Sequence, residues 1–193
     1  VYVSMLAATL AGMAAGLVTG LFHTFMGIPA ILAGILTQFG LYSINLKIMG
    51  KANQAIGADK YDLLVALRYV KNVPFYKNTI FVVTVVVIIL IAILYWFFGT
   101  EMGCALRATG CNSNMSRAQG INTNFSKVLG LMISNGLVGL SGALLCQYQG
   151  FADINMGRGA IVIGLAAVII GEAIFGKIFK NFGLKLLAAV LGS

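Results

Sequence analysis

The sequence has few charged residues: Asp, Glu, Lys and Arg together make up 9% of its 193 residues. Soluble domains carry about 25%, because a surface in contact with water requires that much. Hydrophobic residues account for 60% of the chain, and its mean hydropathy is +0.96. A soluble fold of this length could not bury so much apolar surface in one core. The composition therefore excludes an ordinary soluble domain and indicates an integral membrane protein.

Groups that carry metal or nucleophilic chemistry are also scarce. His23 is the only histidine, and Cys104, Cys111 and Cys146 show no Cys-x-x-Cys or Cys/His ligand spacing. A zinc site or a Cys–His catalytic pair has almost nothing to be built from. We expect no metal site, no bound cofactor and no enzymatic activity.

The cationic residues do not indicate a nucleic-acid surface. The net charge is +8, but the Lys and Arg residues lie in loops and at the ends of apolar segments, as the flanks of membrane helices do. They form no compact basic cluster, so we expect no nucleic-acid partner. Counted over alternate loops, six fall on one side and seven on the other, so charge alone predicts no orientation.

One stretch imitates a nucleotide-binding motif. Residues 171–177 fit the GxxxxGK opening of a phosphate-binding loop, but Ile178 follows where Mg²⁺ coordination needs a Ser or Thr hydroxyl. The stretch also lies in an apolar segment instead of following a buried strand. We therefore expect the chain to bind no nucleotide, so that any energy from ATP arrives through a partner.

Spanning a bilayer takes about 20 mostly apolar residues in a helix. The sequence predicts an all-α polytopic helical bundle in one transmembrane domain over 1–193, with five spans and a truncated sixth at 1–22, 28–46, 79–98, 128–148, 158–176 and 183–193. The first two form either a full hairpin or a partly re-entrant pair. Because the chain begins without Met and stops inside an apolar run, we expect a fragment of a longer protein.

Two polar stretches interrupt these segments. Residues 47–78 are mixed in charge, and helical spacing of apolar residues within 61–72 predicts a surface helix at the membrane interface. The second stretch, 101–127, predicts two short helices. Gly110 and Asn112 end the first, Asn112 or Ser113 caps the second, and Gly120 ends it. Such a loop is either a compact docking element or an ordinary amphipathic connection.

Small and polar residues inside the spans predict contacts. Gly12, Gly16 and Gly20 recur every four residues and so share a helix face against which another helix can pack closely. In 128–148, Asn135, Gly139 and Gly142 share one face. A carboxamide in hydrocarbon needs a partner or water. This face therefore makes an interhelical hydrogen bond or borders a solute route, and the sequence leaves both open.

Glu172 is the only acidic residue inside a predicted span. Its carboxylate either reaches the interface or pairs with Lys177, or it serves transport. The sequence does not decide among these roles.

The 101–127 stretch carries a family resemblance. Its Gly103, the run Ala105-Leu106-Arg107-Ala108, Asn112, Ala118 and the run Gly120-Ile121-Asn122 resemble the cytoplasmic loop of ABC permeases of the branched-chain amino acid and ribose class. Residues 16–24, 28–37 and 41–46 resemble the branch whose binding proteins carry aromatic amino acids such as tryptophan or tyrosine. The likeness covers nearly the whole chain and is weakest at 52–77.

The resemblance implies the membrane-spanning permease of an importer in the bacterial cell membrane. Two such chains would form the pathway, two cytoplasmic ATPases would drive it, and an extracytoplasmic binding protein would deliver the solute. The loop at 101–127 would then be cytoplasmic and would couple to the ATPase through Gly103, Leu106, Arg107, Ala108, Gly110, Asn112, Arg117, Ala118 and Gly120.

For the translocation path we expect Asn135, Gly139 and Gly142, together with Thr37 and Asn45 from the stretch that resembles the aromatic branch. Two other classes of membrane protein compete with this interpretation. A secondary transporter usually needs an intramembrane acid or histidine for ion coupling, and only Glu172 offers an acid. A structural or channel-forming protein would need the helix packing but no docking loop.

Overall fold

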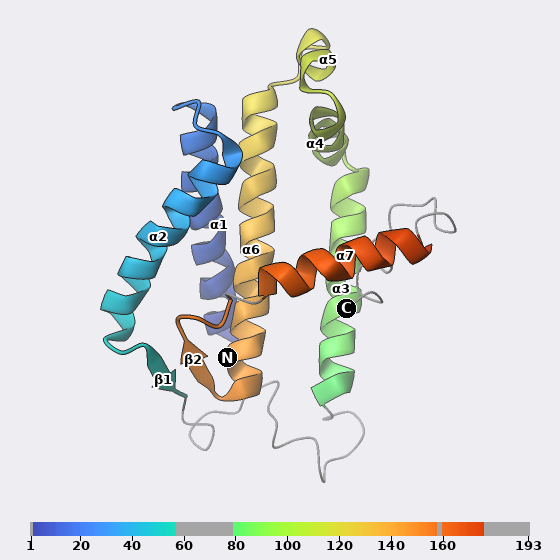
Figure 1. The fold of residues 1–193 in the computed structure, drawn as a ribbon. Coiled ribbons are helices and arrows are strands. Elements are labelled where there is room, and N and C mark those ends of the chain that lie inside the picture. Colours follow the sequence, from blue (N-terminus) through green and yellow to red (C-terminus); the bar gives the residue numbers. More distant parts are fainter. Residues whose placement is uncertain (1, 57–78, 158–159, 176–193) are drawn as a thin grey trace.

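The computed structural model describes residues 2–56, 79–157 and 160–175, and Figure 1 shows them as a bundle of helices. The elements in chain order are α1 (Tyr2–Thr24), α2 (Ala30–Met49), β1 (Asn53–Ala55), α3 (Thr79–Gly99), α4 (Glu101–Cys111), α5 (Ser113–Ala118), α6 (Thr123–Gln149), β2 (Phe151–Asp153) and α7 (Ala160–Phe175). By length and composition, α1, α2, α3 and α6 can each cross a membrane. The predicted all-α polytopic membrane fold is confirmed.

The first three predicted spans match helices within a few residues, but the fourth differs at its start. The span predicted at 128–148 corresponds to α6, which begins earlier, at Thr123. The reason is a cap: Asn122 Oδ1 accepts a hydrogen bond from the Phe125 amide at 3.2 Å. The first turn of α6 therefore occupies the end of the loop predicted at 101–127.

The fifth predicted span, 158–176, corresponds to α7, a helix of 16 residues. Figure 1 shows α7 running across the direction of α3 and α6. Over its described residues α7 is too short to count with the four span-length helices. The interfacial helix predicted at 61–72 and the partial span at 183–193 lie outside the described residues.

A tight turn joins α1 to α2, and both helices are continuous over span length, so the pair is a hairpin. His23 Nδ1 donates to the carbonyl of Ile28 at 2.8 Å across the turn. Gly27 takes a positive φ of 65°, which glycine adopts without steric cost. Pro29, which has no N–H to leave unpaired, directly precedes α2.

Two short strands, which the sequence did not predict, tie loops together at the other end of the bundle. β1 pairs antiparallel with β2, with Gln54 opposite Ala152 (Figure 1). The ladder continues through bonds from Ile56 N to Gly150 O at 2.8 Å and from Ile154 N to Ala52 O at 3.1 Å. It fastens the loop after α2 to the loop after α6.

Burial in the bundle is inverted relative to a soluble protein. Large apolar side chains face outward, and Ile31 is 81% exposed. The buried side chains among the described residues are small or polar: Ala33, Ala167, Thr19, Thr37, Thr109, Ser116, Thr123, Ser126 and Gln147. This is the distribution expected in lipid, where apolar side chains gain nothing by leaving the hydrocarbon and small residues let helices approach closely.

The closest approach is between α1 and α6, which run antiparallel. A Cβ atom on Gly12 or Gly16 would overlap the backbone carbonyl of Asn135 or Leu131, and one on Gly20 would lie 3.0 Å from the Cα of Val128. The predicted glycine stripe therefore lies in this contact, where the absent side chains bring two backbones together. In Figure 1, α1 lies between α2 and α6, so α2 is joined to α6 through α1.

A pair of buried hydroxyls joins α1 to α2. Thr37 Oγ1 donates to the carbonyl of Ala33 at 2.9 Å. Thr19 Oγ1 lies 2.9 Å from Thr37 Oγ1 and also 2.9 Å from the carbonyl of Ala15. Its single proton serves one of these acceptors at a time. Both helices thus satisfy their buried hydroxyls without water.

Gly16→Leu should destabilise the protein strongly, because the new side chain would meet the backbone of Leu131 and not a movable side chain. Overpacking alone typically costs about 1–3 kcal/mol. Thermal melting in mild detergent measures the loss. Gly40→Leu is the matched control, since no atom lies within 4 Å of its Cβ position. Equal melting temperatures for the two variants would show that the α1–α6 contact does not hold the bundle together.

Thr37→Val should have a much smaller effect, about 0.6 kcal/mol, which is typical of a hydrogen bond between membrane helices. The substitution keeps the shape of the side chain and removes only its hydroxyl. A double-mutant cycle with Thr19→Val measures the coupling between the two hydroxyls. Thr9→Val is the control for loss of a hydroxyl, because Thr9 donates only to Leu6 in its own helix. Strictly additive losses at Thr19 and Thr37 would contradict the pairing.

Candidate functional site

The segment of residues 101–122 consists of α4 and α5, and both short helices begin at side-chain caps. Thr100 Oγ1 accepts from the Gly103 amide at 3.4 Å. Asn112 Oδ1 accepts from the amides of Asn114 and Met115, each at 3.1 Å. These caps satisfy amides that the first turns leave unpaired and fix where each helix starts. The helix–break–helix pattern predicted for this stretch is present.

The inner side of α4 is fastened to α3 and α6. A Cβ on Gly103 would overlap the carbonyl of Phe97, so only glycine permits this tight passage from α3 to α4. Leu106 packs on α6, because a Cβ on Gly130 would lie 3.2 Å from the Cδ1 of Leu106. Thr109 is buried and donates to the carbonyl of Ala105 at 2.8 Å. These contacts hold α4 in one position relative to both long helices.

The second short helix, α5, is tied to the start of α6. Arg117 Nη2 donates to Thr123 Oγ1 at 3.1 Å. Ser116 is buried and donates to the carbonyl of Asn112 at 3.0 Å. Gly120 takes a φ of 83° in the turn between the helices, a conformation that L side chains rarely adopt. The whole segment is therefore a rigid projection at one end of the bundle.

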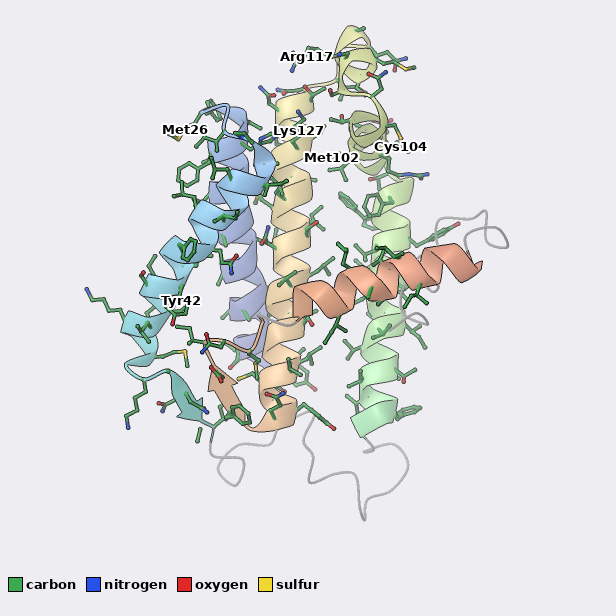
Figure 2. All side chains as sticks on the ribbon, viewed as in Figure 1. Met26, Tyr42, Met102, Cys104, Arg117 and Lys127 are labelled. Atoms are coloured by element: carbon green, nitrogen blue, oxygen red, sulfur yellow. The ribbon has the colours of Figure 1, made fainter. Side chains whose placement is uncertain are left out.

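The outer surface of this projection combines exposed polar and apolar groups. The predicted coupling residues that face outward are Arg107, Ala108, Gly110, Asn112, Arg117, Ala118 and Gly120. Sequence reasoning missed two exposed apolar side chains at this end of the molecule. Met115 on α5 is 59% exposed, and Phe125 in the first turn of α6 is 55% exposed. Their helical positions alone gave no signal, because neither belongs to an apolar stripe. Figure 2 shows Met102, Arg117 and Lys127 at this same end of the molecule.

A cavity of about 880 Å³, here called the polar cavity, lies between this projection and the long helices. Its polar lining comes from His23, Thr109, Asn112, Ser113, Ser126, Lys127 and Ser134. No carboxylate lines it among the described residues. Apolar side chains of α3 and α6, including Phe98 and Leu137, line the remainder.

A second cavity, here called the apolar groove, runs between α3 and α6 and has a volume of about 550 Å³. Leu137 lines it as well, so the two cavities meet at this residue. Among the described residues, Thr84, Ser141 and Tyr148 are the lining residues with side-chain oxygens. The face of α6 that borders both cavities is turned toward α3.

The five residues predicted for the translocation path lie in different environments. Gly139 faces α1, where a Cβ would overlap the carbonyl of Ala8, and Gly142 has open space around it. Thr37 belongs to the α1–α2 contact, and Asn45 is exposed on α2. The Asn135 amide donates to the Leu131 carbonyl of its own helix at 2.9 Å. None of the five is among the residues that line the polar cavity or the apolar groove.

Gln147 is a buried polar residue that sequence reasoning missed. It is 6% exposed, and its Oε1 has no hydrogen-bond partner in the described structure. A buried amide oxygen without a partner is costly in hydrocarbon. Asn135, Cys146 and Gln149 follow a regular spacing that puts them on one face of α6, and Gln147 is not part of that spacing. The sequence pattern therefore directed attention to a different face.

The chain matches a known protein family over its whole length. The model of the family described as "Branched-chain amino acid transport system / permease component" matches residues 1–193. The "Tyrosine transport system permease protein" of Clostridioides difficile (strain R20291) is 41% identical over 191 residues, covering 99% of this chain and 61% of that protein. "Uncharacterized protein RP368" of Rickettsia prowazekii (strain Madrid E) is 37% identical over 174 residues, covering 87% of this chain and 59% of that protein.

A more distant relative is the "Autoinducer 2 import system permease protein LsrC" of Yersinia pestis (strain Pestoides F). It is 28% identical over 199 residues, covering 97% of this chain and 54% of that protein. No solved structure matches the chain. The chain spans between 54% and 61% of the length of these relatives. With a family match over all its residues, the chain belongs to the branched-chain amino acid transport system permease components, a family of membrane transport proteins.

Proposed function

We propose that this chain forms part of the membrane-spanning subunit of an ABC-type importer in a bacterial plasma membrane. The observation that carries the proposal is the rigid 101–122 projection: its inner side is fixed to α3 and α6, and its outer side exposes Arg107 and Arg117 beside small residues. A transmembrane protein that uses ATP hydrolysed elsewhere needs such a rigid element to receive motion from its ATPase. Membership of a transport permease family supports the same function.

Such a subunit would work with three partners. A cytoplasmic ABC ATPase would receive the 101–122 projection in a groove, with Ala108 and Gly110 permitting close approach and the exposed Met115 filling apolar space. An extracytoplasmic binding protein would dock at the opposite end, where β1 and β2 lie (Figure 1). A second copy of the permease would complete the pathway as a homodimer. This assignment places residues 101–127 in the cytoplasm.

The proposed solute is a small molecule of the amino acid class, and an aromatic amino acid fits best. The support is the 41% identity with a permease named for tyrosine transport. The relative named for autoinducer 2 import is less similar, at 28%. Uptake of radiolabelled tyrosine, tryptophan, leucine and ribose by the full-length protein with its ATPase and binding protein would rank the candidates. Uptake of ribose alone would contradict the assignment.

A secondary transporter or a channel is the competing function. Both would work without an ATPase, so copurification of an ATPase separates the importer from these two classes. The full-length permease should retain an ATPase subunit through detergent extraction, and the complex should hydrolyse ATP faster when the binding protein and solute are added. Solute uptake driven by an ion gradient in liposomes without any ATPase would contradict the importer.

Gly110→Glu should uncouple transport from ATP hydrolysis. Gly110 has no atom within 4 Å of its Cβ position, so the β-carbon of glutamate fits there and the longer charged side chain would meet the proposed ATPase groove. Arg107→Glu should act in the same direction by reversing a charge at the docking surface. The measurement is ATP-driven uptake beside the amount of protein in the membrane. Gly110→Ala and Arg107→Lys are the controls, because the first adds only a methyl group in open space and the second keeps the positive charge. Normal uptake in both glutamate variants would exclude this surface as the ATPase contact.

Asn135→Leu tests the path predicted from sequence. If the Asn135 face borders the solute route, this variant should slow uptake while assembly with the ATPase and basal hydrolysis persist. Asn135→Ala removes the amide without adding bulk beside α1, so it separates polarity from packing. A stability loss of about 0.6 kcal/mol with full uptake would assign Asn135 to helix packing instead.

A further inference from the structure

The polar cavity and the apolar groove lie next to each other along α6. The two meet at Leu137, which lines both, and each is bounded by α3 on the other side. Among the described elements, α3 makes its main packing contacts with α4, at one of its ends (Figure 1). Along the rest of its length, the apolar side chains of α3 and α6 border a groove instead of packing against each other.

The chemistry of this space changes along its length. At the end next to the 101–122 projection, its lining includes the ammonium of Lys127, the side chain of Ser113 and the carboxamide of Asn112. Beyond Leu137 it is lined by aliphatic side chains such as Val87 and Leu140. An occupant that satisfies both parts has a polar, anionic end and a long apolar tail.

The charge of the lining identifies the sign of the polar end. Lys127 is the one Lys or Arg among the described residues that line the two cavities. No carboxylate lines either cavity among the described residues. A zwitterionic amino acid would bring an ammonium group that finds no acid among these residues, whereas a phosphate finds the ammonium of Lys127.

We propose that an anionic phospholipid occupies this space, with its phosphate at Lys127 and one acyl chain along the groove between α3 and α6. Basic pockets between membrane helices on the cytoplasmic side bind anionic headgroups in this way. The acyl chain would cover the facing apolar surfaces of α3 and α6. The bound lipid would fill the space between α3 and α6 along the groove. The inference rests on the proposed orientation, with residues 101–127 in the cytoplasm, and not on the identity of the solute.

The test measures lipid bound to the full-length permease after detergent extraction and reconstitution with equal amounts of phosphatidylglycerol and phosphatidylcholine. Native mass spectrometry counts the lipids retained. Phosphatidylglycerol should be retained preferentially, and Lys127→Gln should weaken its binding about fivefold, as expected for loss of one basic residue near an anionic headgroup. Lys127→Arg should preserve binding. Lys47→Gln, in the last turn of α2, removes the same charge outside the cavity and should leave the retention of phosphatidylglycerol unchanged.

A second variant tests the apolar half without changing charge. Leu137→Trp should block the junction of the two cavities and reduce retention of phosphatidylglycerol. Val138→Trp is the matched control, because Val138 is the next residue on α6, is 68% exposed and lines neither cavity. Reduced retention in Leu137→Trp alone supports the proposal, even if Lys127→Gln fails to fold.

Four results would overturn the proposal. Equal retention of phosphatidylcholine and phosphatidylglycerol would mean that no anionic headgroup is recognised. Unchanged retention in both Lys127→Gln and Leu137→Trp would place the lipid elsewhere. Displacement of bound lipid by free tyrosine, or a cysteine cross-link from Ser141→Cys to another part of the permease, would assign the space to the solute or to protein.

Discussion

The close approach of α1 and α6 is the contact on which the rest of the bundle depends. In hydrocarbon, apolar side chains lose nothing by facing lipid, so helices associate only where their surfaces fit closely. Gly12 and Gly16 on α1 meet backbone carbonyls of α6. Gly136 on α6 in turn meets α1, because a Cβ on Gly136 would lie 2.7 Å from the Cγ of Met13. Because glycines on both helices take part, the contact is reciprocal. α2 joins this pair through Thr19 and Thr37, and the β1–β2 ladder ties the far ends together.

Much of this arrangement was predictable from local sequence rules. The glycine stripe at Gly12, Gly16 and Gly20 predicted a packing face because a four-residue spacing repeats on one side of a helix. Asn112 predicted the cap between two short helices, and Gly120 predicted the turn after them. For the cap and the turn, the determining interaction lies within a few residues of the signal, so one sequence is sufficient to find it. The glycine stripe predicted that a packing face exists, but not that α6 packs against it.

The sequence did not predict features that depend on which helix faces which. Asn135 and Gly139 share a face, but periodicity cannot say whether that face meets a solute or another helix, and the structure sets Gly139 against Ala8. The β1–β2 pairing joins residues far apart in the chain through strands too short to show alternation. Gln147 is buried by tertiary packing and stands outside the repeating pattern of polar residues on α6.

The same contacts determine how motion would pass through the proposed importer. Gly103 fixes α4 to the end of α3, and Leu106 fixes it to α6 at Gly130, so a push on the 101–122 projection reaches both helices together. α6 cannot move without α1, because their backbones meet directly. α3 has no such contact along the groove that separates it from α6. The boundary between α3 and the α1–α6 pair is therefore where the structure can most easily change shape, and whatever fills that groove would control the movement.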